Sequence, residues 1–540
     1  MVAGVHYRQM QESSTILSLM PLTPPPLLAA LQQPAAYTHP CREIVHLETH
    51  ISHVFLAGEY AYKLKKPVDF GFLDFTTPEK RRAACAEEVR LNARLAPDIY
   101  LGVVPVCQSD TGYHVRPQGC APGETEVEVL VHMRRFPQEG LLDHLAMTGQ
   151  LTPDMMTDIA QQLARFHATA GRGPEIDQFG SVDSVRAPVM QNFEQTRPYV
   201  GRTVSAATHE CLRAWSEEFL RTHAALFAER VRAGKIVDGH GDLHLRNMCK
   251  LNGRVLIFDC IEFNPALRAG DVMNDIAFLI MDLDHRALAN HANRFLNEYL
   301  EQTRDYAGLK LLDFYRFYRA CVRAKVMSFE SDGVPATERR AVEQEAASYF
   351  DLAEQALAPR TPGLLLTCGV SGSGKTTLAR QAAEVLDGVM VRSDAVRKHL
   401  AGIPLTIRGK ESGTDIYTPS MTERTYAALL QHAREIITSG RWAILDAVYG
   451  RQSERAAAAL LARELHMPFG ILYCQAPPTE LKRRLDQRAS EGRDISDATV
   501  EVLEQQLTRF ETPGPEEGPQ FSWTGKEDPE NWLVSLRTRR

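Results

Sequence analysis

The stretch that decides the fold of the C-terminal part of the chain is Gly369-Val370-Ser371-Gly372-Ser373-Gly374-Lys375-Thr376. It matches the phosphate-binding pattern G-x-x-x-x-G-K-[S/T]. The apolar run Leu364–Cys368 precedes it as an expected strand, and an expected helix follows from Thr376 to Leu386. This arrangement turns backbone N–H groups toward one point, where the helix dipole also favours an anion. We therefore predict that Gly369, Ser371, Gly372, Ser373, Gly374, Lys375 and Thr376 bind a nucleoside triphosphate, with Lys375 at the β- and γ-phosphates and Thr376 on Mg²⁺.

Composition describes an ordinary globular protein of several domains. The chain has 540 residues, which is enough for about two to four domains. Its net charge of −7 argues against a dedicated nucleic-acid binder. Apolar runs are too short to span a membrane, so we expect no membrane partner and a cytoplasmic location. The ten cysteines are scattered without a C-x-x-C pair, which predicts a reducing compartment with neither a zinc site nor a disulfide framework.

Proline-rich stretches suggest where the domains begin and end. Pro24-Pro25-Pro26 closes a poorly patterned start, so residues 1–29 are expected to be a disordered leader. Ala358-Pro359-Arg360-Thr361-Pro362-Gly363 lies in the expected linker, 346–362, between a first domain at 30–345 and a second at 363–512. The segment 513–540 reads as a tail. We expect the two halves to fold independently.

A second constellation lies upstream, in His240-Gly241-Asp242-Leu243-His244-Leu245-Arg246-Asn247, followed by an apolar strand and Asp259. The region around it begins with short strands and becomes mostly helical after Met155, which predicts an α+β, protein-kinase-like bilobal domain. In such a domain Asp242 is the catalytic residue at the acceptor hydroxyl, and Asn247 and Asp259 hold Mg²⁺.

The strand-rich part supplies candidates for the nucleotide. Lys63 lies on an expected strand and can reach the α- and β-phosphates, and Glu88, with Glu87 as the second choice, can pair with it. Arg134-Arg135-Phe136 is expected at the adenine. No G-x-G-x-x-G loop precedes Lys63, and 52–58 is a poor substitute. Asp271 is expected to brace the catalytic loop, and Asp275 only to begin an apolar helix.

The C-terminal half alternates strands and helices, which predicts an α/β domain with a parallel sheet. Asp394 and Arg397 follow its second strand, where Asp394 can engage the acceptor hydroxyl and Arg397 can bind the substrate; the alternative for Asp394 is a helix N-cap. Asp446 ends an apolar strand and is a candidate Mg²⁺ ligand. Arg484 and Arg488 share a helix face and are expected to close over the triphosphate, or else to form a solvated surface.

These motifs resemble two families. The His-Gly-Asp loop looks like the aminoglycoside and choline kinase branch, and D-x-x-R after a phosphate-binding loop resembles the small P-loop kinases that act on polynucleotide 5′-hydroxyls, on gluconate or as zeta toxins. Together they are similar to bacterial proteins described as bifunctional aminoglycoside phosphotransferase/ATP-binding proteins, with an AAA-type small-molecule kinase half. The resemblance implies ATP and Mg²⁺ in both halves.

Several functions fit these predictions. The first is a phosphotransferase with two ATP sites, each acting on a small hydroxylated molecule. The second is a polynucleotide 5′-hydroxyl kinase with a regulatory first half; nucleic acid is less favoured because the second half is nearly neutral. The third is an ATP-dependent switch whose first half is a degenerate kinase, in which the His240–His244 loop is only a polar turn, or a metal cluster formed with Asp242. The acceptor and the oligomeric state are not predicted.

Overall fold

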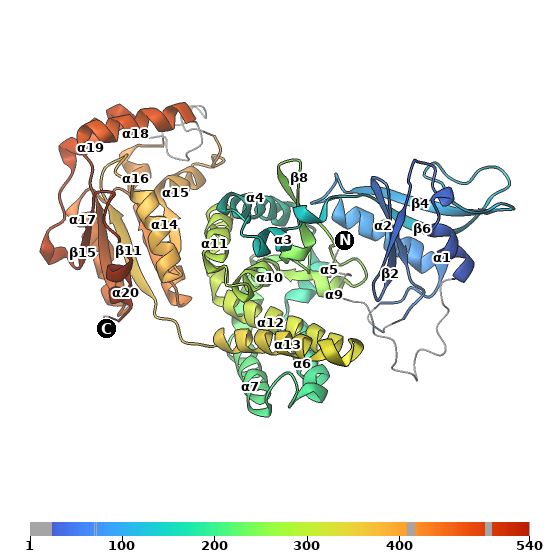
Figure 1. The fold of residues 1–540 in the computed structure, drawn as a ribbon. Helices are drawn as coiled ribbons and strands as arrows, with labels where there is room; N and C mark the ends of the chain where they lie inside the picture. The colour runs from blue at the N-terminus through green and yellow to red at the C-terminus, as the bar shows by residue number, and fades with distance from the viewer. Residues whose placement is uncertain (1–23, 70, 72, 408–415, 492–498, 539–540) are drawn as a thin grey trace. The chain divides into compact units, whose positions relative to one another are not determined.

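The computed structural model describes residues 24–69, 71, 73–407, 416–491 and 499–538. The chain forms two compact units (Figure 1). The first comprises Met1–Ala287 and Leu312–Leu357, and the second comprises Leu288–Leu311 and Ala358–Arg540. The second unit therefore takes a short segment from the middle of the chain, which the sequence did not predict.

The first unit opens with a six-stranded antiparallel sheet in the order β1-β2-β3-β6-β4-β5. Its strands are β1 (Ile44–Glu48), β2 (Ser52–Ala57), β3 (Tyr60–Lys65), β4 (Tyr100–Ser109), β5 (Gly112–Val115) and β6 (Thr125–Arg134). Alternation along β3 turns Tyr62 and Leu64 toward one apolar cluster and Ala61 toward another. Lys63 and Lys65 share the Ala61 face, which is the face covered by helix α2 (Pro78–Asn92).

A short helix contradicts part of the predicted leader. Helix α1 (Pro25–Leu31) begins inside it and buries Leu27 and Leu31 against the Tyr62 face of the sheet. Pro25 suits the first helical turn because its missing N–H has no partner there in any case. Residues 1–23 of the leader lie outside the described residues.

The rest of the first unit is mostly helical, as expected. Two small antiparallel strand pairs frame the segment that follows: β7 (Ile236–Asp238) pairs with β10 (Ala269–Asp271) at its two ends, and the hairpin of β8 (Met248–Leu251) and β9 (Arg254–Ile257) lies within it. The α-helices are α3 (Leu142–Met147), α4 (Pro153–Thr169), α5 (Pro174–Asp177), α6 (Val182–Thr196), α7 (Ala206–Thr222), α8 (Ala224–Arg232), α9 (Pro265–Arg268), α10 (Val272–His285), α12 (Leu309–Gly333) and α13 (Ala336–Gln355). The predicted bilobal α+β class is confirmed.

The second unit holds a five-stranded sheet in the order β12-β13-β11-β14-β15, and every neighbouring pair is parallel. This confirms the predicted α/β class. The strands are β11 (Gly363–Cys368), β12 (Val389–Arg392), β13 (Trp442–Asp446), β14 (Phe469–Cys474) and β15 (Gln520–Trp523). The helices are α11 (Ala289–Thr303), α14 (Lys375–Leu386), α15 (Ser393–Leu400), α16 (Pro419–Thr438), α17 (Gln452–Glu464), α18 (Pro478–Glu491), α19 (Val500–Arg509) and α20 (Glu530–Thr538).

The predicted tail is part of this second domain. Strand β15 extends the sheet beyond β14, and Trp523, Leu533 and Leu536 are buried in one cluster with helix α14. The apolar spacing is too sparse to stand out from the surrounding Pro, Gly and Glu, so the sequence alone did not reveal it. The expectation of a tail at 513–540 is therefore wrong.

Two further findings concern the cysteines and the helices. Cys107 on β4 is joined to Cys120 by one disulfide, which the prediction of a reducing compartment did not include. The β4–β5 hairpin and the turn after it bring together these two cysteines, whose spacing forms no motif. The other eight cysteines are free. Among the described residues, the helices are all too short or too polar to cross a membrane.

Candidate active sites

The first unit gathers a charged cluster around Lys63. Its ammonium donates to Glu88 Oε1 at 2.8 Å and to Asp259 Oδ1 at 3.2 Å, although Asp259 lies 196 residues further along the chain. Burial opposes the charge on Lys63, but Asp259 and Glu88 outweigh it and raise the lysine pKa well above its usual value. Glu88 is the partner of Lys63, and Glu87 instead meets Arg90 and Arg268.

Two members of this cluster were missed by the sequence reasoning. Lys65 contacts the other oxygen of Glu88 at 2.5 Å and also pairs with Glu262, and both side chains are buried. Burial disfavours the lysine's charge, but Glu262 and Glu88 raise its pKa to about 12. Lys65 lies two residues after Lys63, hence on the same face of β3, which was the available signal. The two lysines and three carboxylates sum to one negative charge.

The catalytic loop places Asp242 beside Asn247. The Asn247 amide donates to Asp242 Oδ2 at 2.8 Å, and His244 Nε2 lies 3.3 Å from the same oxygen. Burial raises the pKa of Asp242, but His244 outweighs it and holds the pKa below its usual value. Asn247 Oδ1 is buried without a hydrogen-bond partner. The Phe258 N–H donates to the Asn247 carbonyl at 2.9 Å, which connects this loop to the neighbouring Asp259.

The loop is braced by Asp275, which corrects the prediction for Asp271. Asp275 accepts from the backbone N–H groups of His240 and Gly241, both at 2.8 Å, whereas Asp271 pairs with Arg230 at 2.7 Å. Asp275 was overlooked because it lies one turn inside an apolar helix.

His240 is a structural residue of this loop. Its Nε2 lies 3.1 Å from the Phe258 carbonyl and its Nδ1 accepts from the Asp242 N–H at 3.3 Å. One donor and one acceptor require the neutral ring, and burial lowers the His240 pKa to about 4. Within the described ranges, the three-residue group with metal-ligand spacing is Cys107, Cys120 and Glu124, so the predicted alternative of a His240–His244 metal cluster is not supported.

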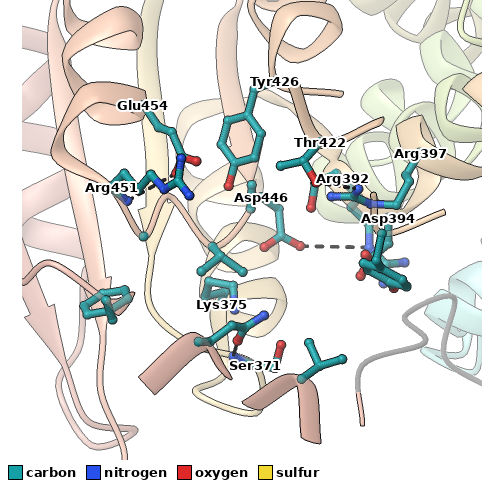
Figure 2. Close-up of a pocket in the computed structure, with 18 of the residues that line it drawn as sticks. Ser371, Lys375, Arg392, Asp394, Arg397, Thr422, Tyr426, Asp446, Arg451 and Glu454 are labelled. Carbon is teal, nitrogen blue, oxygen red and sulfur yellow. Dashed lines mark hydrogen bonds and ion pairs between the residues drawn. The ribbon is translucent and has the colours of Figure 1, made fainter. Parts of the chain in front are cut away.

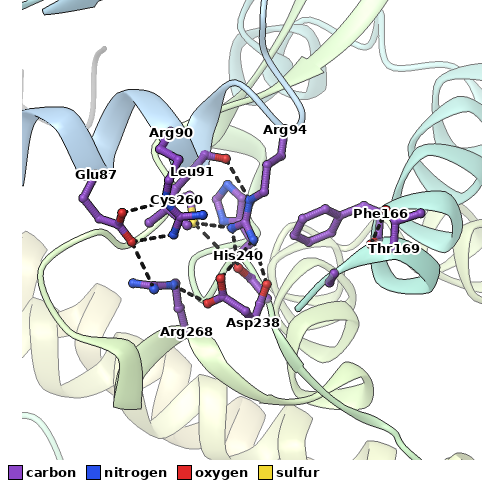
Figure 3. Close-up of polar contacts among 12 residues, drawn as sticks. Glu87, Arg90, Leu91, Arg94, Phe166, Thr169, Asp238, His240, Cys260 and Arg268 are labelled. Atoms are coloured by element: carbon purple, nitrogen blue, oxygen red, sulfur yellow. Dashed lines mark hydrogen bonds and ion pairs between the residues drawn. The ribbon is translucent and has the colours of Figure 1, made fainter. Parts of the chain in front are cut away.

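A polar network connects helix α2 to the base of the loop (Figure 3). Arg94 donates to the carbonyls of Asp238 and Gly239 at 2.8 and 2.9 Å. Arg268 donates to Asp238 Oδ1 at 2.5 Å and to Glu87 at 3.3 Å. The helix that carries Glu88 is thus fixed to the loop that carries Asp242.

The expected adenine region lies at a cavity of about 660 Å³. Its walls include apolar side chains of β1, β2 and the β8–β9 turn together with the predicted hinge: Leu47, Leu56, Arg134, Arg135, Phe136 and Leu251. Before Lys63, where no G-x-G-x-x-G loop occurs, the chain forms the β1–β2 turn. There Thr49 N–H donates to the Ser52 carbonyl at 2.8 Å, and Ser52 N–H donates to the Thr49 hydroxyl at 3.0 Å.

The second unit places the phosphate-binding loop between β11 and α14. Thr376 Oγ1 donates to Asp446 Oδ2 at 2.7 Å, and Lys375 Nζ donates to the Val370 carbonyl at 2.9 Å. Gly374 has a φ of +96°, and a Cβ there would lie 2.5 Å from Trp523 of the supposed tail. Only glycine satisfies both the backbone and the packing at this position.

Two neighbours of the loop were not predicted. Gln506 on α19 accepts from the Ser371 N–H at 2.8 Å, and Trp523 of β15 packs beside Gly374. The Ser373 hydroxyl is buried without a partner. Gly369, Gly372 and Gly374 all have positive φ, which the predicted turn requires.

A cavity of about 280 Å³ extends from this loop (Figure 2). Asp446 lies at its centre, with Asp394, Arg397 and Thr422 on one side and Arg451 and Glu454 on the other. Asp394 lies in the first turn of α15, whose N-cap is Arg392 without a side-chain cap bond. The capping alternative for Asp394 is therefore wrong, and its carboxylate lines the cavity.

Arg397 is a buried arginine on the cavity wall. It is 6% exposed. Its Nη1 donates to the Ile416 carbonyl and the Thr422 hydroxyl at 3.0 and 3.2 Å, but its Nε has no hydrogen-bond partner. Among the described residues no carboxylate pairs with it. A buried guanidinium without a counter-ion is costly, so this position favours an anion.

The structure shows the side-chain position of only one of the two arginines predicted on α18. Arg484 donates to the Gly372 carbonyl at 3.2 Å and to Glu480 at 2.7 Å, which places it against the phosphate-binding loop. Arg488 lies one turn further along α18, but its side chain is outside the described residues.

Comparison with known proteins agrees with this division. Residues 69–312 match the phosphotransferase enzyme family, and residues 364–513 match an AAA domain family. The chain is 34% identical over 458 residues to an uncharacterized protein of Mycobacterium tuberculosis strain H37Rv, covering 84% of this chain and 88% of that one.

Two solved structures are similar to parts of the chain. A choline/ethanolamine kinase family protein from Mesorhizobium loti is 14% identical, with a TM-score of 0.36, and the match covers 60% of this chain and 90% of that one. A gluconokinase from Sinorhizobium meliloti is 21% identical, with a TM-score of 0.23, and the match covers 33% and 90%.

Proposed function

We propose that this chain, an ATP-dependent kinase that belongs to the same family as its mycobacterial relative, transfers the γ-phosphate of ATP at two separate sites to hydroxyl groups of small molecules. The observation that supports two sites is their duplication. Each unit groups its own lysine, its own pair of hard oxygen ligands and its own accessible acidic residue: Asp242 is partly exposed in the first unit and Asp394 lines the cavity of the second. We place both reactions in the cytoplasm, where ATP is supplied.

The residues present in both units suit Mg²⁺, which binds oxygen ligands. Asn247 Oδ1 is buried without a partner, and the Lys63 cluster beside it carries one excess negative charge. In the second unit the Thr376 hydroxyl and the Asp446 carboxylate lie 2.7 Å apart. We propose that Asn247 and Asp259 hold the ion in one site, and Thr376 and Asp446 in the other. When bound, the ion neutralises charge on the transferred phosphoryl group.

In the first unit, Glu88 orients Lys63 toward the phosphates and Asp242 receives or orients the proton of the acceptor hydroxyl. The depressed pKa of Asp242 keeps it ionised near neutral pH, the state that can accept a proton. An ionised Asp242 held by Asn247 and His244 favours an active first half over the degenerate switch.

In the second unit, we propose that Asp394 meets the acceptor hydroxyl while Arg397 binds an anionic group of the same molecule. The buried Arg397 guanidinium, which stacks on the Tyr417 ring and for which the described residues supply no carboxylate, supports this assignment. The acceptor is therefore proposed to be a hydroxylated carboxylic acid or phosphate ester small enough for the cavity.

The test is transfer from γ-labelled ATP by the full chain and by its Lys63→Ala and Lys375→Ala variants. The acceptors are neutral polyols, hydroxy acids, sugar phosphates and a 5′-hydroxyl oligonucleotide. We expect Lys375→Ala to abolish labelling of an anionic acceptor, and Lys63→Ala to abolish labelling of a different one. Labelling of the oligonucleotide alone would favour a polynucleotide kinase. Loss of all labelling in a single variant would contradict the two-site proposal.

A further inference from the structure

Helix α11 belongs to the second unit although it lies within the stretch that matches the phosphotransferase family, residues 69–312. It follows α10 in the chain and ends at Thr303, 66 residues before the phosphate-binding loop begins at Gly369. Its buried residues are Ala292, Asn293, Phe295, Leu296, Asn297, Tyr299, Leu300 and Glu301. A helix outside the AAA-domain match is thus built into that domain.

The helix covers the exposed edge of the sheet. Strand β12 is an edge strand, so its outward N–H and C=O groups have no strand partner. Asn297 Oδ1 accepts from the Met390 N–H at 2.6 Å, and the amides of Asn293 and Asn297 donate to the Gly388 carbonyl at 3.0 and 3.1 Å. These side chains satisfy the edge and fix the position of α11 along β12.

One turn after Asn297, Glu301 reaches the end of the same strand. Glu301 Oε1 lies 3.6 Å from Arg392 Nη1, and Arg392 Nε lies 3.9 Å from Asp446 Oδ2. All three side chains are at least nine-tenths buried. The backbone carbonyl of Glu301 also meets His399 Nε2 at 2.8 Å. Arg392 lines the cavity and stands between the Glu301 carboxylate and the carboxylate proposed to hold Mg²⁺.

We propose that Glu301 is a positioning residue of the second kinase site. Its charge holds the Arg392 guanidinium at the wall, so that Asp446 keeps its oxygens for the ion. Without that charge, the guanidinium shifts its attraction to Asp446 and competes with Mg²⁺. This inference rests on the proposed phosphoryl transfer in the second unit. It assigns part of that site to a helix that lies outside the residues matching the AAA domain family.

The matched control is on the same helix. Glu298 lies three residues before Glu301 and pairs with Arg294 at 3.0 Å within α11. Glu298→Gln therefore removes a charge from the same helix and leaves both members of the Arg392–Glu301 pair in place. Because Glu298 raises the pKa of Glu301, its removal also favours the ionised Glu301 on which the inference depends. Glu301→Asp keeps the charge and tests whether the carboxylate itself is needed.

The experiment uses the full chain with Lys63→Ala to silence the first site, and measures ATP binding by calorimetry as Mg²⁺ is varied. Glu301→Gln should raise the Mg²⁺ concentration needed for half-maximal ATP binding by about tenfold, as expected for loss of an outer positioning partner of a metal ligand. Metal-free ATP binding should change less than about twofold, because the phosphate-binding loop is untouched. Glu298→Gln should match the parent, and Glu301→Asp, which keeps the charge, should retain most of the parent's Mg²⁺ dependence.

A double substitution separates positioning from a structural role. If Glu301 acts through Arg392, adding Glu301→Gln to Arg392→Gln should cause no further change in Mg²⁺ dependence. Additive effects, an unchanged Glu301→Gln variant, or an equal effect of Glu298→Gln would each overturn the inference. If the parent binds no ATP, the proposed function of the second unit fails, and this inference fails with it.

Discussion

The two units surround a lysine with opposite strategies. In the second, the eight consecutive residues 369–376 supply the backbone turn, Lys375 and Thr376. In the first, Lys63, Glu88 and Asp259 come from a strand, a helix and a distant loop, and meet only when the unit folds. The Lys375 ammonium donates a hydrogen bond to a backbone carbonyl, whereas the Lys63 ammonium forms ion pairs with carboxylates. The second unit should therefore lose less stability than the first when its lysine is removed.

The largest effect is expected from removing residues 513–540. This truncation deletes strand β15 and helix α20, removing Trp523, Leu533 and Leu536 from the core beside α14. Losing these three buried apolar side chains costs about as much as the whole stability of a typical domain, since each contributes about 2–5 kcal/mol and a domain is stable by about 5–15 kcal/mol. We expect the second unit to lose its thermal transition in calorimetry and ATP binding with it. A truncated chain with an intact second transition would contradict the placement of β15.

The next effect concerns chemistry in the first unit. With Lys375→Ala present to silence the second site, Asp242→Asn should lower phosphoryl transfer by about two to four orders of magnitude, the usual range for a lost general base. ATP binding should persist, because Lys63 and Asp259 are unchanged. Asp259→Asn should also weaken Mg-ATP binding, since a metal ligand is lost. Small, equal effects of the two substitutions on turnover and affinity would show that both carboxylates are structural.

The lysines allow a direct comparison. Lys375→Ala should weaken ATP binding by the second unit about tenfold to a hundredfold, because a hydrogen bond to a charged group contributes about 1.5–3 kcal/mol. Its melting temperature should hardly change. Lys63→Ala should instead destabilise the first unit by about 3 kcal/mol, since it removes one partner of a buried ion pair. Equal thermal shifts for the two variants, measured by calorimetry, would remove the distinction between the sites.

The sequence alone could predict features that are encoded by residues close together in the chain. The loop 369–376, the strand Leu364–Cys368 before it and the strands before Asp394 and Asp446 were identified because their signals lie within a few residues of one another. The pairing of Lys63 with Glu88 came from spacing typical of a known fold. Lys65 and Glu262 were missed, since nothing in their separate neighbourhoods links them.

The segment α11 shows where such reasoning fails. Asn293, Asn297 and Glu301 look like the polar face of a helix in the first domain, and only the folded chain brings them to β12. We expected the two halves to fold independently. A fragment that begins at residue 358 lacks α11, so the second unit is now expected to need that helix as well. The disulfide between Cys107 and Cys120 and the brace by Asp275 depend in the same way on long-range packing.

The smallest predicted effect is a pH dependence of the assembled site. The pKa of His240 is lowered to about 4 by burial, whereas the unfolded side chain titrates near 6.5. Between these values the unfolded state binds the extra proton, so the stability of the first unit falls as pH decreases from about 6.5 to 4. Asp275, which faces the same loop, has a pKa of about 2 and stays ionised throughout this window. Arg94, Asp242 and Asp259 are the other charged groups acting on the ring, and the pKa values of both carboxyls are lowered despite burial, that of Asp242 chiefly by His244 and that of Asp259 chiefly by Lys63. His240→Asn retains a donor and an acceptor but cannot titrate. It should lower the pH slope of the first unit's unfolding free energy by at most about 1.4 kcal/mol per pH unit, while the second unit's transition is unchanged. Calorimetry at several pH values measures both slopes. An unaltered slope in the variant would mean that His240 is accommodated in its charged form, in conflict with its contacts to the Phe258 carbonyl and the Asp242 N–H.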